Sequence, residues 1–462
     1  MPGSSAFTRA LASPSWWRAE EWAVASPCPS PRGSPRPCDV SFSPMRALLI
    51  GSGSRGDFQP MLALAVAMRR AGHTVTLLGS PVFQAEAEAF GISFGPCGHD
   101  VREILSKTRE QTRTPLGFVR TLNSIIEIEF ELQLAHIEPR VQGVDLVVGG
   151  GAVMAAHLLA DAARVPYRYI GYTPQILPSS YHPMMMVPIT RSPRWLNRLL
   201  WRVSGGFYNR QMDKRYNAHR TRRGLPRDED SFSSIFPREK TLLACDPELL
   251  PAPPDLADVP QVGSFALPDD RPLPPDLEAF LSAGPPPIYV GFGSMPDDDP
   301  QRTTQRVREA AQKAGVRLLL SAGWSGLGGG EDLGPSAHGV GPVSHGLLFP
   351  RLAGSVHHGG AGTTAASARA GIPQLLVPHA FDQFMFARQV HKLGLGPQPI
   401  PKGALTVERL AEGLRELANN GPMREKARAT GESIRSRDPL RAAVSWLEGA
   451  LAGHKGATAR SA

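Results

Sequence analysis

The sequence predicts an α/β protein built from two consecutive Rossmann-like domains, each with a parallel, doubly wound sheet. A strand, a glycine loop, a helix and a second strand follow one another from Met45 to Gly79, and the same order restarts at Ile288 after a Pro-rich stretch. Short apolar runs that alternate with helical stretches are typical of parallel sheets covered by helices on both faces. With 462 residues, 41% of them apolar, the chain is long enough for two cores of ordinary size.

The first half is divided by clear chemical signals. The run MRALLI at Met45–Ile50 predicts the first strand, and Pro60 and Gly72 suit the first turn and the end of the helix that follows. Further elements expected in this half are a strand at His73–Gly79, a strand at Asp145–Val148, a helix at Ala152–Arg164 and a strand at Tyr167–Tyr172.

The second half repeats this order after the Pro-rich run Pro247–Pro287, which predicts a linker around one short strand. Elements expected after it are a strand at Ile288–Gly291, a helix at Gln301–Ala314, a strand at Arg317–Ala322, a strand near Ser355–Val356, a helix ending at Ala370 and a strand from Gln374. The expected division is a leader at 1–44, a first domain at 45–250, a linker region at 251–287, a second domain at 288–438, and a C-terminal helix and tail at 439–462.

Residues 1–44 are rich in Pro, Ser and Arg and show no periodicity, so we expect a disordered leader. Because Met45 lies where many Rossmann-type chains begin, we hypothesise that this leader reflects a start codon assigned too far upstream. Its detection in the native protein by mass spectrometry would refute that hypothesis.

Composition excludes several classes of protein. The four cysteines lack the spacing of a zinc site or a disulfide framework, which favours a reducing, cytoplasmic setting. The net charge is +8, yet residues 191–223 hold ten Lys/Arg and one acid, so this segment carries +9 and the rest of the chain −1. Such a basic segment with tryptophans either lies on the inner, anionic face of a membrane or caps the first domain. No recognition motif accompanies the charge, so no nucleic-acid partner is expected.

The first loop, GSGSRGDFQP, contains the G-x-G-x-x-G pattern of dinucleotide-binding sites. Such a site needs an acid at the end of the second strand, where this chain reads LLGSP. Asp57 would also direct a negative charge at a bound pyrophosphate. A dinucleotide site is therefore disfavoured.

The loop HHGGAGTT at 357–364 is the better phosphate site. Glycines allow close backbone approach, two threonines open a helix, and a helix N-terminus attracts phosphate. A tight strand-to-helix turn would explain the glycines without explaining His358.

The run from Val343 to Pro397, together with GFGSM and GSGSRGDFQP in the expected order, resembles the nucleotide-sugar glycosyltransferases of the GT-B fold. The resemblance spans Met45 to about Leu451 and is closest to the branch with sterol glucosyltransferases and antibiotic glycosyltransferases. It implies two Rossmann-like domains that face each other across a cleft, and a transfer reaction that needs no cofactor and no metal.

The resemblance also implies roles for individual residues. The donor diphosphate would be held by Ser294, His358, Thr363 and the backbone at Gly360 and Gly362. The pair Asp382 and Gln383 would bind sugar hydroxyls, and the backbone near Val343 would bind the base. The plant relatives' ribose-binding Glu is replaced by Ala366, so the nucleotide contacts must differ in detail. UDP and dTDP both remain open as donors. Helix capping is the alternative role for Asp382.

The resemblance makes Asp57 the general base of an inverting transfer. A single displacement at the anomeric carbon needs one carboxylate to take the proton of the acceptor hydroxyl, while helix N–H groups stabilise the leaving diphosphate. The alternative is that Asp57 caps the helix beginning near Pro60. The acids Asp297–Asp299 are expected to be a solvated loop with capping acids rather than a metal motif.

The predicted function is thus a UDP- or dTDP-dependent hexosyltransferase, with glucose favoured, acting on a hydroxyl of an apolar acceptor such as a sterol, polyketide, flavonoid or lipid. Tyr172 and Met184 are candidates for the acceptor pocket, with core packing as the alternative for Met184. A nucleotide-sugar epimerase or hydrolase, or a non-catalytic activator partner, are the rival functions.

Overall fold

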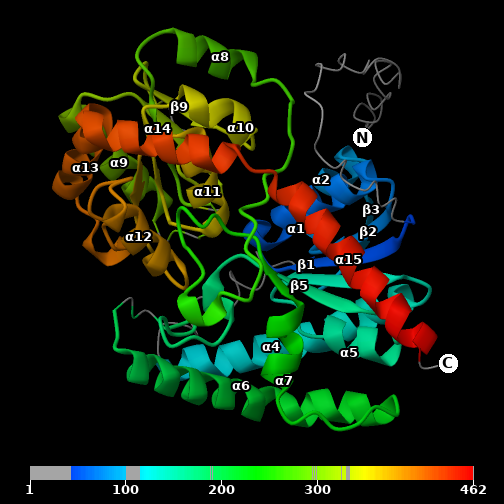
Figure 1. Cartoon of the computed structure of the whole chain (residues 1–462). Helices are drawn as coiled ribbons and strands as arrows, with labels where there is room; N and C mark the ends of the chain where they lie inside the picture. Colours follow the sequence, from blue (N-terminus) through cyan, green and yellow to red (C-terminus); the bar gives the residue numbers. More distant parts are fainter. Residues whose placement is uncertain are drawn as a thin grey trace, which may run out of the picture. The chain divides into compact units, whose positions relative to one another are not determined.

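The computed structural model describes residues 43–99, 115–187, 189, 191–293, 295, 297, 299–323, 325–328 and 333–460 (Figure 1). It contains two sheets in which every pair of neighbouring strands is parallel. The first has six strands in the order β3-β2-β1-β4-β5-β6 and the second has five in the order β11-β10-β7-β8-β9. The predicted α/β class with two parallel sheets is confirmed.

The first sheet and its helices come from the first half of the chain, with the following bounds: β1 Arg46–Ser52, α1 Arg55–Arg70, β2 Thr74–Gly79, α2 Gln84–Ala89, β3 Ser93–Pro96, α4 Pro115–Val141, β4 Leu146–Gly151, α5 Ala156–Ala162, β5 Tyr167–Gly171, α6 Arg194–Arg222, α7 Ser231–Ile235 and β6 Thr241–Leu243. Alternate residues of β1 enter different cores, as the pleat requires. Ala47 and Leu49 pack on the α1 side, whereas Leu48 and Ile50 pack with α4 and α5 on the other.

The second sheet and its helices have the following bounds: α8 Pro275–Ser282, β7 Ile288–Gly291, α9 Pro300–Ala314, β8 Leu318–Ser321, β9 Ala337–Val340, α10 His345–Leu348, β10 Gly354–His357, α11 Ala361–Ala370, β11 Gln374–Leu376, α12 Gln383–Lys392, α13 Val407–Asn419, α14 Gly421–Arg435 and α15 Pro439–Arg460. Val290 and Val356 join α9 and α13 in one core, and Tyr289 packs with α10 on the other face. The β7 and β10 strands lie side by side, so the loops after them adjoin.

Two boundary predictions are wrong. Helix α1 begins at Arg55 rather than near Pro60, because Ser54 and Asp57 form a capping box that starts the helix earlier and leaves Pro60 inside it. The Pro-rich linker contains no strand of its own. It holds a single bridge from Leu243 to Gln261, a 3₁₀ helix at Pro254–Leu256 and the helix α8. Prolines lack the N–H groups that a ladder needs.

The C-terminal helix returns to the first sheet. Ala443, Val444 and Leu447 of α15 are buried in the core that contains α1, and α15 crosses α1 in Figure 1. His73, just before β2, makes a 3.1 Å contact through Nε2 with Glu448 Oε1. The core beside β1 is therefore completed by residues about 400 positions further along the chain.

Among the helices that the structure describes, none combines the length and the apolar character needed to cross a bilayer.

Candidate active site

The start of α11 is an open helix N-terminus. Gly360 occupies the N-cap position and no side chain caps the helix, so the first N–H groups are not satisfied within it. Thr364 is buried and donates its hydroxyl to the Gly360 carbonyl at 2.9 Å, whereas Thr363 lies at the third helical position and is partly exposed. A Cβ on Gly362 would meet nothing within 4 Å. The geometry suits an anion that binds backbone N–H groups and one hydroxyl.

His358 is held between two glycines at this N-terminus. A Cβ at Gly293 would come within 2.8 Å of the imidazole Cε1, and one at Gly360 within 2.5 Å of Nε2. Burial lowers the pKa of His358 to about 4, so the ring is neutral at pH 7 and keeps one N–H to donate. Its Nδ1 is buried and has no hydrogen-bond partner among the described residues.

The neighbouring His357 has a structural role instead. Its Nδ1 accepts a hydrogen bond from the Gly359 N–H at 3.1 Å, which leaves Nε2 to donate to Gln374 Oε1 at 2.9 Å. Both bonds are buried and fix the turn that directs His358 toward Gly293. Two adjacent histidines thus have different environments, which the letters HH alone do not distinguish.

Asp57 lies at the third position of α1, just after β1. Its Oδ2 accepts from the Ser54 N–H at 2.8 Å and from the Ser54 hydroxyl at 3.1 Å. Burial raises the pKa of Asp57 to about 6, although both Ser54 bonds lower it. Capping and a raised pKa occur together here, so the capping alternative does not exclude a role as a base.

The glycines around Asp57 make room for its carboxyl group. A Cβ at Gly53, whose φ is +132°, would come within 2.3 Å of Oδ2, and one at Gly151 within 2.7 Å of Oδ1. Tyr172 donates its hydroxyl to the Asp57 backbone carbonyl at 2.9 Å. Gly53 of GSGSRGD and Gly151 after β4 therefore make room for the Asp57 carboxylate.

Asp382 and Gln383 lie at the start of α12, where the Asp382 side chain makes no cap bond and the Gln383 side chain binds backbone N–H groups. Asp382 occupies the N-cap position but makes no side-chain cap bond, so the simple capping role is not observed. Burial, and next the charge of Asp57, raise the pKa of Asp382 to about 7. Gln383 Oε1 accepts from the N–H groups of His379 and Ala380 at 2.8 and 3.0 Å. Its amide nitrogen makes only a 3.6 Å contact with Met295 Sδ among the described residues, a weak acceptor that a stronger one could replace.

Phe381 was missed in the sequence. Its φ is +55° and its ring is 43% exposed, directly before Asp382. A bulky residue in this backbone region is costly and tends to occur at functional sites. No local sequence pattern predicts a left-handed backbone conformation at a phenylalanine, so only the structure shows it.

The remaining predicted site residues, Val343 and Met184, pack into cores away from His358, Asp57 and Asp382, and Ser294 lies outside the described residues. Val343 lies in the turn before α10 and packs beside the core that holds Leu348 and Phe349. Met184 is 8% exposed and buried with Trp201, which is the packing alternative for this residue. Ser294 falls outside the described residues, although Gly293 beside it is described.

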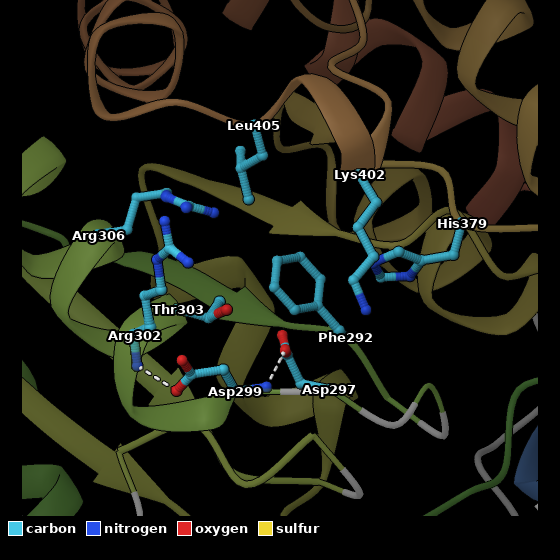
Figure 2. A pocket seen from close by; sticks show the side chains of 9 residues that line it. All are labelled: Phe292, Asp297, Asp299, Arg302, Thr303, Arg306, His379, Lys402 and Leu405. Atoms are coloured by element: carbon cyan, nitrogen blue, oxygen red, sulfur yellow. Dashed lines mark hydrogen bonds between the residues drawn. The ribbon is translucent and has the colours of Figure 1, made fainter. Parts of the chain in front are cut away.

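Asp297 and Asp299, after β7, line a pocket of about 160 Å³ together with Arg302, Arg306 and Lys402, as Figure 2 shows. Asp299 caps α9 by accepting from the Arg302 N–H at 3.0 Å, and Asp297 accepts from the Asp299 N–H at 3.0 Å. The capping role predicted for these acids is confirmed at Asp299, while Asp298 lies outside the described residues. His379 lines the same pocket, and burial lowers its pKa to about 3.

Comparisons with known proteins point the same way. The family model of the glycosyltransferase family 28 N-terminal domain matches residues 47–167. The model of the erythromycin biosynthesis protein CIII-like C-terminal domain matches residues 331–444. The chain is similar to the vancomycin aglycone glucosyltransferase of Amycolatopsis orientalis, with 35% identity over 367 residues that cover 77% of this chain and 87% of the relative.

A more distant relative and a solved structure extend the likeness. The chain is 29% identical to the sterol 3-beta-glucosyltransferase of Emericella nidulans over 437 residues, which are 89% of this chain and 30% of that protein. The crystal structure of glycosyltransferase VinC in complex with dTDP aligns with a TM-score of 0.63 at 19% identity and covers 88% of this chain and 99% of its own. That structural likeness supports the fold.

Proposed function

Because the chain belongs to the GT-B glycosyltransferases with a family 28 type N-terminal domain and an EryCIII-like C-terminal domain, we propose that it transfers a hexose from a UDP- or dTDP-sugar to a hydroxyl of an apolar acceptor, with inversion. The observation that carries the proposal is the position of a partly buried carboxylate, Asp57, at the start of α1, and of the open N-terminus of α11, on two helices that contact each other. Besides burial, the charge of Asp57 raises the pKa of Asp382 at the start of α12. The base and the anion site thus come from different halves of the chain, and an inverting displacement needs them on opposite sides of the anomeric carbon.

In the proposed reaction, the acceptor oxygen attacks the anomeric carbon and its proton passes to Asp57. The bond to the diphosphate oxygen breaks, and the leaving group keeps the electron pair. A base with a pKa of about 6 is mostly ionised at pH 7. Its pKa also lies closer to the working pH than that of an ordinary aspartate, which makes it a better proton acceptor. The N–H groups of α11, the Thr363 hydroxyl and the His358 N–H are suited to the charge that develops on the leaving diphosphate.

Sugar recognition is assigned to Asp382 and the Gln383 amide nitrogen. A carboxylate accepts hydrogen bonds from hydroxyls and an amide N–H donates to them, so the pair suits the neighbouring hydroxyls of glucose. The names of the relatives motivate the acceptor class, since one acts on the vancomycin aglycone and another on sterols. We propose an apolar, hydroxylated acceptor of this kind.

The donor is tested first by calorimetry with UDP- and dTDP-sugars, followed by mass-spectrometric screening of sterols, polyketides and flavonoids with the sugar that binds. Nuclear magnetic resonance of the product then gives the anomeric configuration, and retention would refute inversion. Release of free hexose or an epimer at the full rate without acceptor would favour the hydrolase or epimerase instead.

The base is tested with Asp57→Asn. The variant keeps an oxygen for the Ser54 bonds, so we expect donor affinity within about twofold of wild type and transfer reduced about 10²- to 10⁴-fold. Asp276→Asn, at a side chain that is 72% exposed, is the matched control. Full transfer by Asp57→Asn would refute the assignment.

A further inference from the structure

Helix α6 carries an exposed apolar stripe. Four apolar side chains follow one another at intervals of four residues, which places them along one side of the helix. They are Trp195, Leu199, Val203 and Phe207, with exposed fractions of 64%, 46%, 61% and 42%. The opposite side of α6 is buried, where Trp201, Met212 and Tyr216 pack in the core under the first sheet. The stripe therefore lies on a helix that is already docked.

A basic stripe runs directly beside the apolar one. An exposed arginine precedes each of Trp195, Leu199 and Val203 in the sequence. The row is interrupted at Gly206 and continues with Arg210 and Lys214. These first arginines are Arg194, Arg198 and Arg202. Arg194 stacks over the half-exposed ring of Tyr181 at 4.3 Å, which adds an aromatic side chain to the same edge. No ion pair of Arg198, Arg202 or Arg210 is found within the part of the chain that the structure describes.

The C-terminal part of α6 differs, because most of its basic side chains are paired with acids of the same molecule, Arg222 excepted. Arg215 pairs with Glu127, His219 with Glu131 and Arg223 with Glu138, all three acids belonging to α4. The acids of α4 therefore pair with basic residues at the C-terminal end of α6, whereas the arginines of its N-terminal half remain exposed to solvent. The unneutralised end is also the one with the apolar stripe.

We propose that this face of α6 docks on an anionic lipid surface. A helix with an apolar stripe bordered by Lys and Arg lies in the plane of a bilayer interface, where the apolar side chains enter the acyl boundary and the cations meet lipid phosphates. Trp195 lies at one end of the stripe, and tryptophan prefers this depth. The stripe runs from Trp195 to Phe207, 12 helical steps or about 18 Å, enough for contact along its length. Helix α6 lies on the side of the first sheet opposite α1 and α15 (Figure 1).

The charge pattern favours lipid over a protein partner. Asp213 is the one acid of the whole basic segment 191–223. A second copy of this chain would bring a second row of arginines against the first, which like charges oppose. An anionic leaflet provides negative charge over the whole length of the row. The proposal is independent of the sugar and acceptor assigned above.

Vesicle co-sedimentation tests the proposal with the full chain. We expect binding to phosphatidylcholine vesicles containing 30% phosphatidylglycerol (on the order of a native anionic leaflet), little binding to phosphatidylcholine alone, and release as salt rises toward about 0.5 M. The combined variant Arg198→Gln, Arg202→Gln and Arg210→Gln removes three unneutralised charges, which predicts about 100-fold weaker binding. Val203→Glu should weaken binding without removing a cation.

The matched control removes three exposed arginines elsewhere, with Arg70→Gln, Arg424→Gln and Arg441→Gln, and has the same net charge as the α6 variant. Equal loss of binding in both would overturn the proposal, since it would mean that overall charge alone decides. So would a wild-type chain that stays in the supernatant with anionic vesicles. A wild-type dimer that Val203→Glu converts to monomer, with no vesicle binding, would instead identify a protein interface. Unchanged melting temperature and donor binding show that each variant is folded.

Discussion

At the scale of single residues, the site is defined by groups whose ionisation is shifted away from their usual values. The two carboxyls Asp57 and Asp382 have raised pKa values and the imidazole of His358 a lowered one, with burial as the first cause in each case. Desolvation therefore favours the neutral form of all three groups in the absence of a ligand. Shifted groups that gather in one place are typical of catalytic sites.

The raised pKa of Asp57 predicts an acid limb in the rate of transfer. A base must be deprotonated, so kcat/KM should fall about tenfold per unit of pH below about 6 and level off above it. An aspartate with its ordinary pKa of 3.8 would keep the rate flat down to about pH 5. The measurement is kcat/KM between pH 4.5 and 8.5 at saturating donor. A flat profile over that range would contradict the assigned base.

Asp382 predicts a gain of stability when its charge is removed. Its pKa in the folded protein is above the ordinary value, so the folded state binds the proton more tightly than the unfolded state does. This contribution is fully present below pH 3.8 and is lost as the pH rises through about 7. We expect Asp382→Asn to raise the free energy of unfolding by about 1–2 kcal/mol at pH 8 and by little at pH 4.

Denaturant unfolding at the two pH values measures the difference for Asp382→Asn. Asp276→Asn, at an exposed carboxyl, is the control and should change stability by less than about 0.5 kcal/mol. The same Asp382 variant should bind donor more weakly, because it loses an acceptor for sugar hydroxyls. A variant that is less stable than wild type at pH 8 would contradict the raised pKa.

At the scale of elements, the anion site depends on how closely the loop after β7 approaches the start of α11. Gly293 and Gly360 leave just enough space between them for the His358 ring. The two loops adjoin because β7 and β10 are neighbours in the sheet. Strand order, rather than any local motif, brings GFGSM and HHGGAGTT together.

This packing predicts the effect of Gly360→Ala. The φ of −62° suits alanine, so the backbone is not strained, but the added Cβ would lie 2.5 Å from His358 Nε2 and displace the ring. We expect donor binding to weaken at least about tenfold, consistent with the loss of a hydrogen bond to a charged group. Gly403→Ala, where the Cβ meets nothing within 4 Å, is the control. Calorimetry with the nucleoside diphosphate makes the comparison, and equal affinities would contradict the packing argument.

At the scale of the whole molecule, the sequence was sufficient for the fold class and the family but not for every strand or for long-range packing, since β3, β6 and β9 were not predicted. Apolar runs and turn residues located β1, β2, β4, β5 and β7 to within a few residues, because those signals are local. The resemblance to GT-B glycosyltransferases is confirmed. Pro60 suggests a helix that starts near it, whereas the Ser54–Asp57 capping box starts α1 at Arg55, and Phe381 carries no local signal.

The docking of α15 on the first sheet had no sequence signal, because its partners lie some 400 residues away, and it carries the last prediction. Leu447 is fully buried against α1, so Leu447→Ala should lower the free energy of unfolding by about 2–4 kcal/mol. Ser445→Ala, on the exposed side of the same helix, should change it by less than about 0.5 kcal/mol and controls for helix propensity. Denaturant unfolding of both variants gives the comparison. If Leu447→Ala were as stable as Ser445→Ala, the helix would not be docked in solution, and the core beside β1 would have to be closed by other residues.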